Sequence, residues 1–91
     1  MNDELIAHAA IGEQVADFLE TDIGKILVGI AKQEYQLAIE AIAETDPFDA
    51  KAIQKLQNQA QLYKHFREWL AELVDKGIAA REIFMQQERT E

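Results

Sequence analysis

The residues best suited to binding a metal ion are His65 and Glu68, three positions apart in a segment with helical periodicity. An imidazole and a carboxylate at this spacing share one helix face, and di-metal sites in helical bundles use such a pair twice, with two further carboxylates. The pair occurs once here, because His8 has no acid three residues after it. We interpret His65 as a surface histidine beside Lys64 and Arg67, and we expect no metal site.

Groups for nucleophilic or acid-base catalysis are scarce. The chain has no cysteine and no serine, and its threonines fall at expected helix ends or in the tail, where capping explains them. Carboxylate pairs such as Glu40 and Glu44 are one helical turn apart, which is typical of a solvated face. Gly24 and Gly29 lie inside an apolar helical pattern rather than in a phosphate-binding loop. We therefore expect no catalytic residue, no cofactor and no enzymatic activity.

Length and charge restrict the class of protein further. A chain of 91 residues fits one domain, residues 1–91, with a modest core. Its net charge of -8 repels the nucleic-acid backbone and anionic membranes. The first residues carry acids where a secretory signal carries bases, and the most apolar window, 23–31, falls short of the roughly 18 residues that a membrane span needs. We expect a cytosolic protein with no membrane partner.

Helix formers and helical periodicity dominate the chain, and its one proline is Pro47. We expect helices at about 3–20, 22–45 and 47–86. Thr21 can cap the second helix, leaving at most a kink or a short turn before it. Asp46 can cap the third, with Pro47 as its first residue, and so short a connection makes the two long helices antiparallel neighbours. The predicted fold is all-α, a long antiparallel helical hairpin with an N-terminal helical arm.

The expected second helix carries two apolar stripes, and a single partner cannot cover both. The first stripe consists of Ile23, Leu27, Ile30, Leu37 and Ala41, and the second of Val28, Ala31, Tyr35, Ala38 and Ile42. A glycine inside a helix costs about 1 kcal/mol relative to alanine. We therefore expect Gly24 and Gly29 to mark close approaches of two backbones.

The expected third helix has an apolar seam with alternating steps of three and four residues, and we expect it to pass through Gly77. It is longer than the second helix by roughly 25 Å at about 1.5 Å per residue. Its overhang bears large apolar side chains that need a cover, either the first helix or a second chain. We expect a homo-oligomer, with a dimer as the simplest closed form. The predicted packing or interface residues are Tyr35, Leu56, Tyr63, Phe66, Trp69, Leu70, Leu73 and Ile78.

Charge is distributed unevenly along the chain. Six acids precede the first base, Lys25, whereas no acid occurs from Ala50 to Arg67, a segment that carries Lys51, Lys55, Lys64 and Arg67. One hypothesis is that the acidic and basic surfaces meet, within one chain or between chains. The alternative is a small nucleic-acid-binding regulator that uses these four residues as a basic face, with nearby aromatic side chains stacking on bases. The net charge disfavours it.

Several motifs resemble a family of small tailed-bacteriophage proteins encoded among head and packaging genes. They are Ile23-Gly24, Asp46-Pro47-Phe48-Asp49-Ala50, residues 53–59 and Trp69-Leu70. The resemblance implies a helical phage protein made in the cytoplasm of an infected bacterium, with a part in virion assembly and contacts to other phage structural proteins. It implies no catalytic residue, and the first twenty residues contribute little to it.

Overall fold

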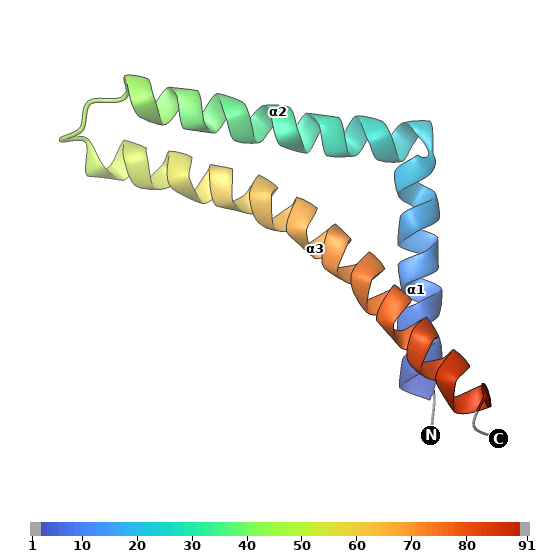
Figure 1. Ribbon diagram of the computed structural model, residues 1–91. Coiled ribbons are helices and arrows are strands. Elements are labelled where there is room, and N and C mark those ends of the chain that lie inside the picture. The colour runs from blue at the N-terminus through green and yellow to red at the C-terminus, as the bar shows by residue number, and fades with distance from the viewer. Residues whose placement is uncertain (1–2, 90–91) are drawn as a thin grey trace.

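The computed structural model describes residues 3–89, and all secondary structure within that range is helical. The elements are α1 (Asp3–Glu20), α2 (Asp22–Glu44) and α3 (Ala50–Arg89). The predicted all-helical class is confirmed. Figure 1 shows that α2 and α3 lie side by side near their connecting turn and then separate, while α1 returns from the far end of α2 to cross the second half of α3.

A single residue, Thr21, separates α1 from α2, and the chain turns sharply there (Figure 1). Thr21 has an extended backbone, and its hydroxyl oxygen accepts a hydrogen bond from the Gly24 N–H at 3.0 Å. The same hydroxyl donates to the carbonyl oxygen of Phe18 at 2.5 Å. A Cβ atom on Gly24 would overlap that carbonyl group. The close approach predicted at Gly24 is therefore present, and it lets α2 leave directly against the end of α1.

The predicted close approach at Gly29 is wrong. A Cβ atom added there would meet no atom within 4 Å, so this glycine contributes no packing contact within the chain. Gly29 lies on an exposed part of α2, whereas Gly24 is buried. Helical spacing alone did not distinguish the two positions.

The start of α3 also differs from the prediction. Asp46 was expected to cap this helix with Pro47 as its first residue, but the Asp46 carboxylate accepts from the Phe48 N–H at 2.9 Å within the turn. The helix begins at Ala50, where Asp49 acts as the cap and its carboxylate accepts from the Ala52 N–H at 3.2 Å. Both aspartates stabilise local backbone N–H groups, and the second stands closer to the helix.

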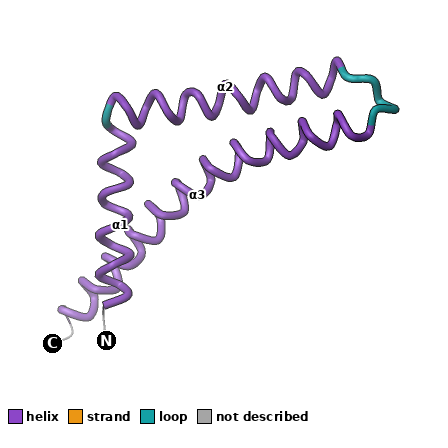
Figure 2. The backbone as a smooth tube through the Cα atoms, turned by 180° about the vertical axis from the view of Figure 1, so that it is seen from behind, coloured by secondary structure: helices purple, strands orange, loops and turns teal. Residues whose placement is uncertain are grey.

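α3 continues through Gly77 without a break, as predicted, and reaches Arg89. Its second half passes α1 (Figure 2), and α1 packs more extensively on α3 than on α2. The first helix therefore packs on the overhang within the same chain. The sequence alone is compatible with either cover for this part of α3, the first helix or a second chain.

The crossing of α1 and α3 is a contact between two glycines. A Cβ atom on Gly12 would lie 2.6 Å from the Gly77 Cα atom, and one on Gly77 would lie 2.7 Å from the Gly12 Cα atom. Both glycines are buried. Beside them the Arg81 guanidinium donates to the Glu13 carboxylate at 2.9 Å. Glycine at both positions lets the two backbones touch.

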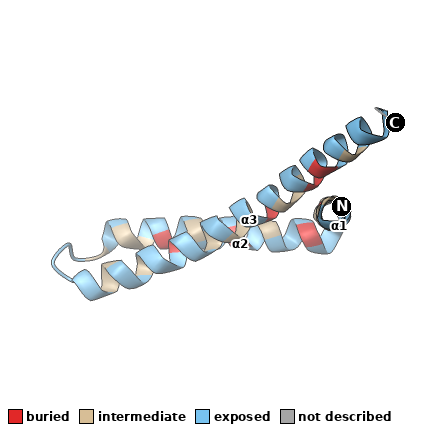
Figure 3. Cartoon of the chain, turned by 90° about the horizontal axis from the view of Figure 1, so that it is seen from below, coloured by how far each residue is buried: buried red, intermediate tan, exposed pale blue. Residues whose placement is uncertain are grey.

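The molecule is long and thin, with principal extents of 64 × 27 × 15 Å. Its radius of gyration is 18.6 Å, whereas a compact chain of this length has a radius of about 12 Å. The buried residues form short, isolated bands along the helices (Figure 3), and the buried hydrophobic side chains are Ala31, Ala38, Ala60, Leu70 and Ala80.

We expect Gly12→Ala to lower the free energy of unfolding by about 1–3 kcal/mol, because the added methyl group forces the two backbones apart. The matched control is Gly29→Ala, which adds the same methyl group in open space and should raise stability by about 0.5–1 kcal/mol. Urea unfolding followed by circular dichroism measures both. A Gly12→Ala protein as stable as Gly29→Ala would contradict the crossing.

We expect Thr21→Ala to cost about 1 kcal/mol, because it removes the hydroxyl that satisfies an N–H group at the start of α2. Thr21→Ser keeps the hydroxyl and should retain most of the stability. The same unfolding measurement applies. Equal losses in the two variants would mean that the threonine methyl group, rather than the cap, stabilises the corner.

Candidate interaction surface

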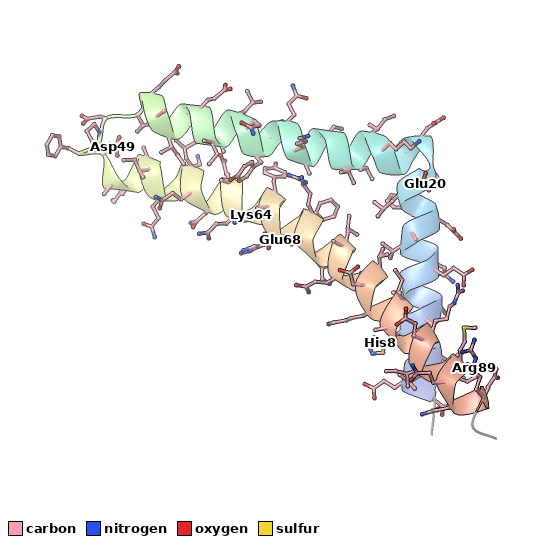
Figure 4. All side chains as sticks on the ribbon, in the orientation of Figure 1. His8, Glu20, Asp49, Lys64, Glu68 and Arg89 are labelled. Atoms are coloured by element: carbon pink, nitrogen blue, oxygen red, sulfur yellow. The ribbon has the colours of Figure 1, made fainter. Side chains whose placement is uncertain are left out.

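The residues first considered for chemistry are spread over exposed helix faces. His65 and Glu68 are both exposed, and a Glu68 carboxylate oxygen lies 3.9 Å from the Lys64 Nζ atom one turn away (Figure 4). Within residues 3–89, no group of three or more acidic or histidine side chains is placed to hold a metal ion. No polar or charged side chain in this range is buried. The described part of the chain therefore offers no enclosed polar site.

The groove between α2 and α3 is almost purely apolar. It has a volume of about 310 Å³, and α2 contributes Leu27, Ile30 and Ala31 to it, while α3 contributes Leu62, Tyr63 and Phe66. Leu27, Ile30 and Leu62 remain 44%, 48% and 64% exposed at its edges. These side chains form an apolar patch that the chain itself leaves uncovered.

The two stripes of α2 have different surroundings. The second stripe is buried or half-buried throughout, with Ala31 and Ala38 in the core. In the first stripe, Ile23 and Leu37 are 60% and 49% exposed, like their neighbours Leu27 and Ile30. One stripe thus packs within the chain, and the other lies on one side of it without a cover.

On α3 the uncovered side continues from Leu62 to Trp69, seven residues further, a spacing that returns to the same helix face. Trp69 is 56% exposed. We call the set that lines and flanks the groove the apolar face. It consists of Ile23, Leu27, Ile30, Leu37, Leu62 and Trp69.

The structure divides the predicted interface residues into three groups. Leu70 is buried, and Tyr35, Leu56, Tyr63, Phe66 and Leu73 are half-buried. Tyr63 and Phe66 line the apolar groove, and Trp69 is exposed on the apolar face. Ile78 is 54% exposed and lies beside the crossing of α1 and α3, away from the groove. Most of these residues thus pack within the chain.

The four predicted basic residues do not share one face. Lys51 and Lys55 line a shallow groove along the start of α3 together with Leu62. Lys64 and Arg67 line a different groove with Tyr35 and the Glu68 carboxylate. Lys64 comes nine residues after Lys55. At about 100° per residue, this spacing places the two side chains on opposite sides of the helix.

Leu62 and the first stripe of α2 were absent from the predicted interface. Leu62 does not fall on the apolar seam of α3, whose members follow one another by alternating steps of three and four residues, so the seam did not predict it. The first stripe is visible in the sequence, and the rule that one partner cannot cover both stripes indicated that one stripe needs a further partner. The sequence did not show which stripe faces α3.

No helix within residues 3–89 has both the length and the apolar character needed to cross a membrane.

Comparison of the chain with protein-family models, with curated proteins and with solved structures found no match in any of the three.

Proposed function

We propose that this chain is a non-enzymatic structural or assembly protein that acts through protein contacts and associates with itself. Its working unit is the long antiparallel hairpin of α2 and α3 with α1 as an N-terminal arm. The observation that carries the proposal is the elongated shape of the chain, with extents of 64 × 27 × 15 Å and a radius of gyration of 18.6 Å. Folded domains are built from layers packed around one core, and a chain this elongated leaves much of its apolar surface for another chain to cover.

The exposed area supports this proposal. The accessible surface is 7145 Å², whereas a compact protein of 10.3 kDa exposes about 5,400 Å². The excess is roughly 1,800 Å². Standard interfaces bury about 800 Å² per partner, and obligate dimers bury considerably more. An excess of this size fits a chain that completes its core on assembly.

The composition of the core supports it as well. Among residues 3–89, four of the five buried hydrophobic residues are alanines, and no large side chain is fully buried. Burial of apolar surface contributes about 25 cal/mol per Å², so small side chains add little stability. Many of the larger side chains that could add more are left exposed, and six of them form the apolar face.

The biological setting rests on the resemblance to small tailed-bacteriophage proteins carried by the turn at residues 46–50 and the segment at 53–59. We propose that the protein is made in the cytoplasm of an infected bacterium and takes part in virion assembly. Its partners are then further copies of itself and other phage structural proteins. A small helical protein that associates through apolar surfaces suits such a role.

A nucleic-acid-binding regulator is the second candidate. It rests on the segment 50–67, which contains four basic residues and no acidic residue. Two observations weigh against it. The net charge is -8, and the four basic side chains lie in two grooves on different sides of α3. Nucleic-acid binding relies on basic side chains gathered on one surface of the protein, so the assembly role has better support.

We expect the purified full chain to have at least twice the monomer mass in multi-angle light scattering at micromolar concentration. The reason is the area of apolar side chains that one chain leaves exposed to water. Circular dichroism checks that the sample is helical. A helical protein that stays a monomer up to the highest soluble concentration would refute self-association.

We expect no saturable binding to short duplex or single-stranded DNA at physiological salt, because the chain's acidic field repels phosphates. A gel-shift titration measures this. Lys51→Gln with Lys55→Gln is the matched variant, and it should behave as the unmodified chain does. Saturable binding that these two substitutions abolish would favour the regulator over the assembly protein.

A further inference from the structure

We infer that a second copy of this chain docks on the apolar face, with α2 of each copy lying against the first half of α3 of the other. The inference rests on the proposed self-association and specifies its surface and its partner. The six residues of the apolar face come from two helices and flank one groove, so they form a continuous contact area. A two-fold arrangement brings the same face of both copies together.

The two sides of this face carry opposite charge. α2 contains four acidic and two basic residues, whereas residues 50–67 contain no acidic residue, and two of their basic residues, Lys51 and Lys55, line a groove with Leu62 of the apolar face. Glu34 falls between Ile30 and Leu37 along the first stripe, four residues after one and three before the other. Lys55 lies seven residues before Leu62 and lines a groove with it. Glu34 and Lys55 are both exposed.

Charge complementarity therefore selects the arrangement of the two copies. Stacking α2 on α2 brings acids together, and stacking α3 on α3 brings bases together. A two-fold axis that runs along the groove instead places the acidic side of one copy over the basic side of the other. Complementary potentials set the register of protein interfaces in this way.

The exposed surface area of the chain agrees with a second copy as the partner. The chain exposes roughly 1,800 Å² beyond a compact fold of its mass, about twice what each partner buries in a standard interface. A second copy has the same excess of exposed surface area, and one contact between the two copies reduces the exposed area of both. A short peptide in the groove would leave Ile23, Leu37 and Trp69 in water.

The first test compares Ile30→Asp with Ile39→Asp. Both isoleucines are exposed on α2, at 48% and 41%, and nine residues apart they lie on opposite sides of the helix. We expect Ile30→Asp to weaken dimerisation at least tenfold in sedimentation equilibrium, because it buries a charge at the centre of the contact. Ile39→Asp should leave the dissociation constant within about twofold of the unmodified chain.

Circular dichroism checks that each variant is still helical, and Leu62→Asp on α3 replaces Ile30→Asp if the latter unfolds. Trp69 is the chain's one tryptophan and provides a second readout. Its emission should shift to longer wavelength when the protein is diluted or carries Ile30→Asp, and should not shift in Ile39→Asp.

The second test reverses charges. Glu34→Lys and Lys55→Glu should each weaken the homodimer several-fold, because each reduces the difference in charge between the α2 side and the α3 side of the face. A mixture of the two variants should dimerise as tightly as the unmodified chain, since the contacts between different copies are again complementary. The effect should shrink between about 0.05 and 0.5 M salt, as screening shortens the reach of charges.

The outcomes separate the two proposals. An unmodified chain that is a monomer refutes both self-association and this interface. A multimer that is insensitive to Ile30→Asp and Leu62→Asp, or that loses as much affinity with Ile39→Asp, refutes the apolar face and leaves self-association standing. Failure of the charge-reversed pair to recombine refutes the placement of α2 on α3.

Discussion

The contact between Gly12 and Gly77 is the constraint on which the rest of the structure depends. Three helices joined end to end have two connections, and this crossing is the third point at which they meet. It gives the far half of α3 a neighbour within the chain and fixes the direction of α1. Without it α1 would be tied to the remainder by the one-residue corner at Thr21 alone.

Closing three straight rods at three points also determines the shape. The three helices outline a triangle in Figure 1, and Figure 3 shows that the second half of α3 leaves the direction of α2 and passes α1 on one side. Side chains are therefore buried only where two helices approach closely, and close approach requires small residues. This geometry explains why glycines and alanines dominate the buried set, in which Leu70 is the one large side chain within residues 3–89.

The parts of the fold that local chemistry determines were predictable. Thr21 caps a helix, Gly77 does not interrupt one, and the Asp-Pro-Phe-Asp segment breaks the chain between two helices. The exact cap of α3 was not predictable, because Asp46 and Asp49 offer the same carboxylate and differ only in the turn that each stabilises. Helix direction at the corner was also beyond local rules, since a threonine cap is compatible with a kink or a sharp turn.

Contacts between distant residues were harder to predict for a physical reason. Gly12 and Gly77 are 65 positions apart, and nothing in either local pattern links them, whereas Gly29 has a more suggestive apolar context and a Cβ atom added to it would meet nothing within 4 Å. The apolar face was only partly predictable in the same way. The seam rule identified Tyr63 and Phe66 because they follow one helix, but Leu27 and Leu62 join one groove through the placement of two helices.

The difference between the two sides of the layer bears on how far the proposed assembly would grow. One groove beside α3 is almost purely apolar, whereas the groove on another side of this helix is lined by Lys64, Arg67 and Glu68. A chain with adhesive surfaces on both sides of its layer would stack without limit, since heterologous contacts that do not close form fibres. Docking through the apolar face about a two-fold axis closes the pair instead, because each copy uses that face once. Closed pairing is then the form in which an elongated, acidic chain can complete its core and remain dispersed.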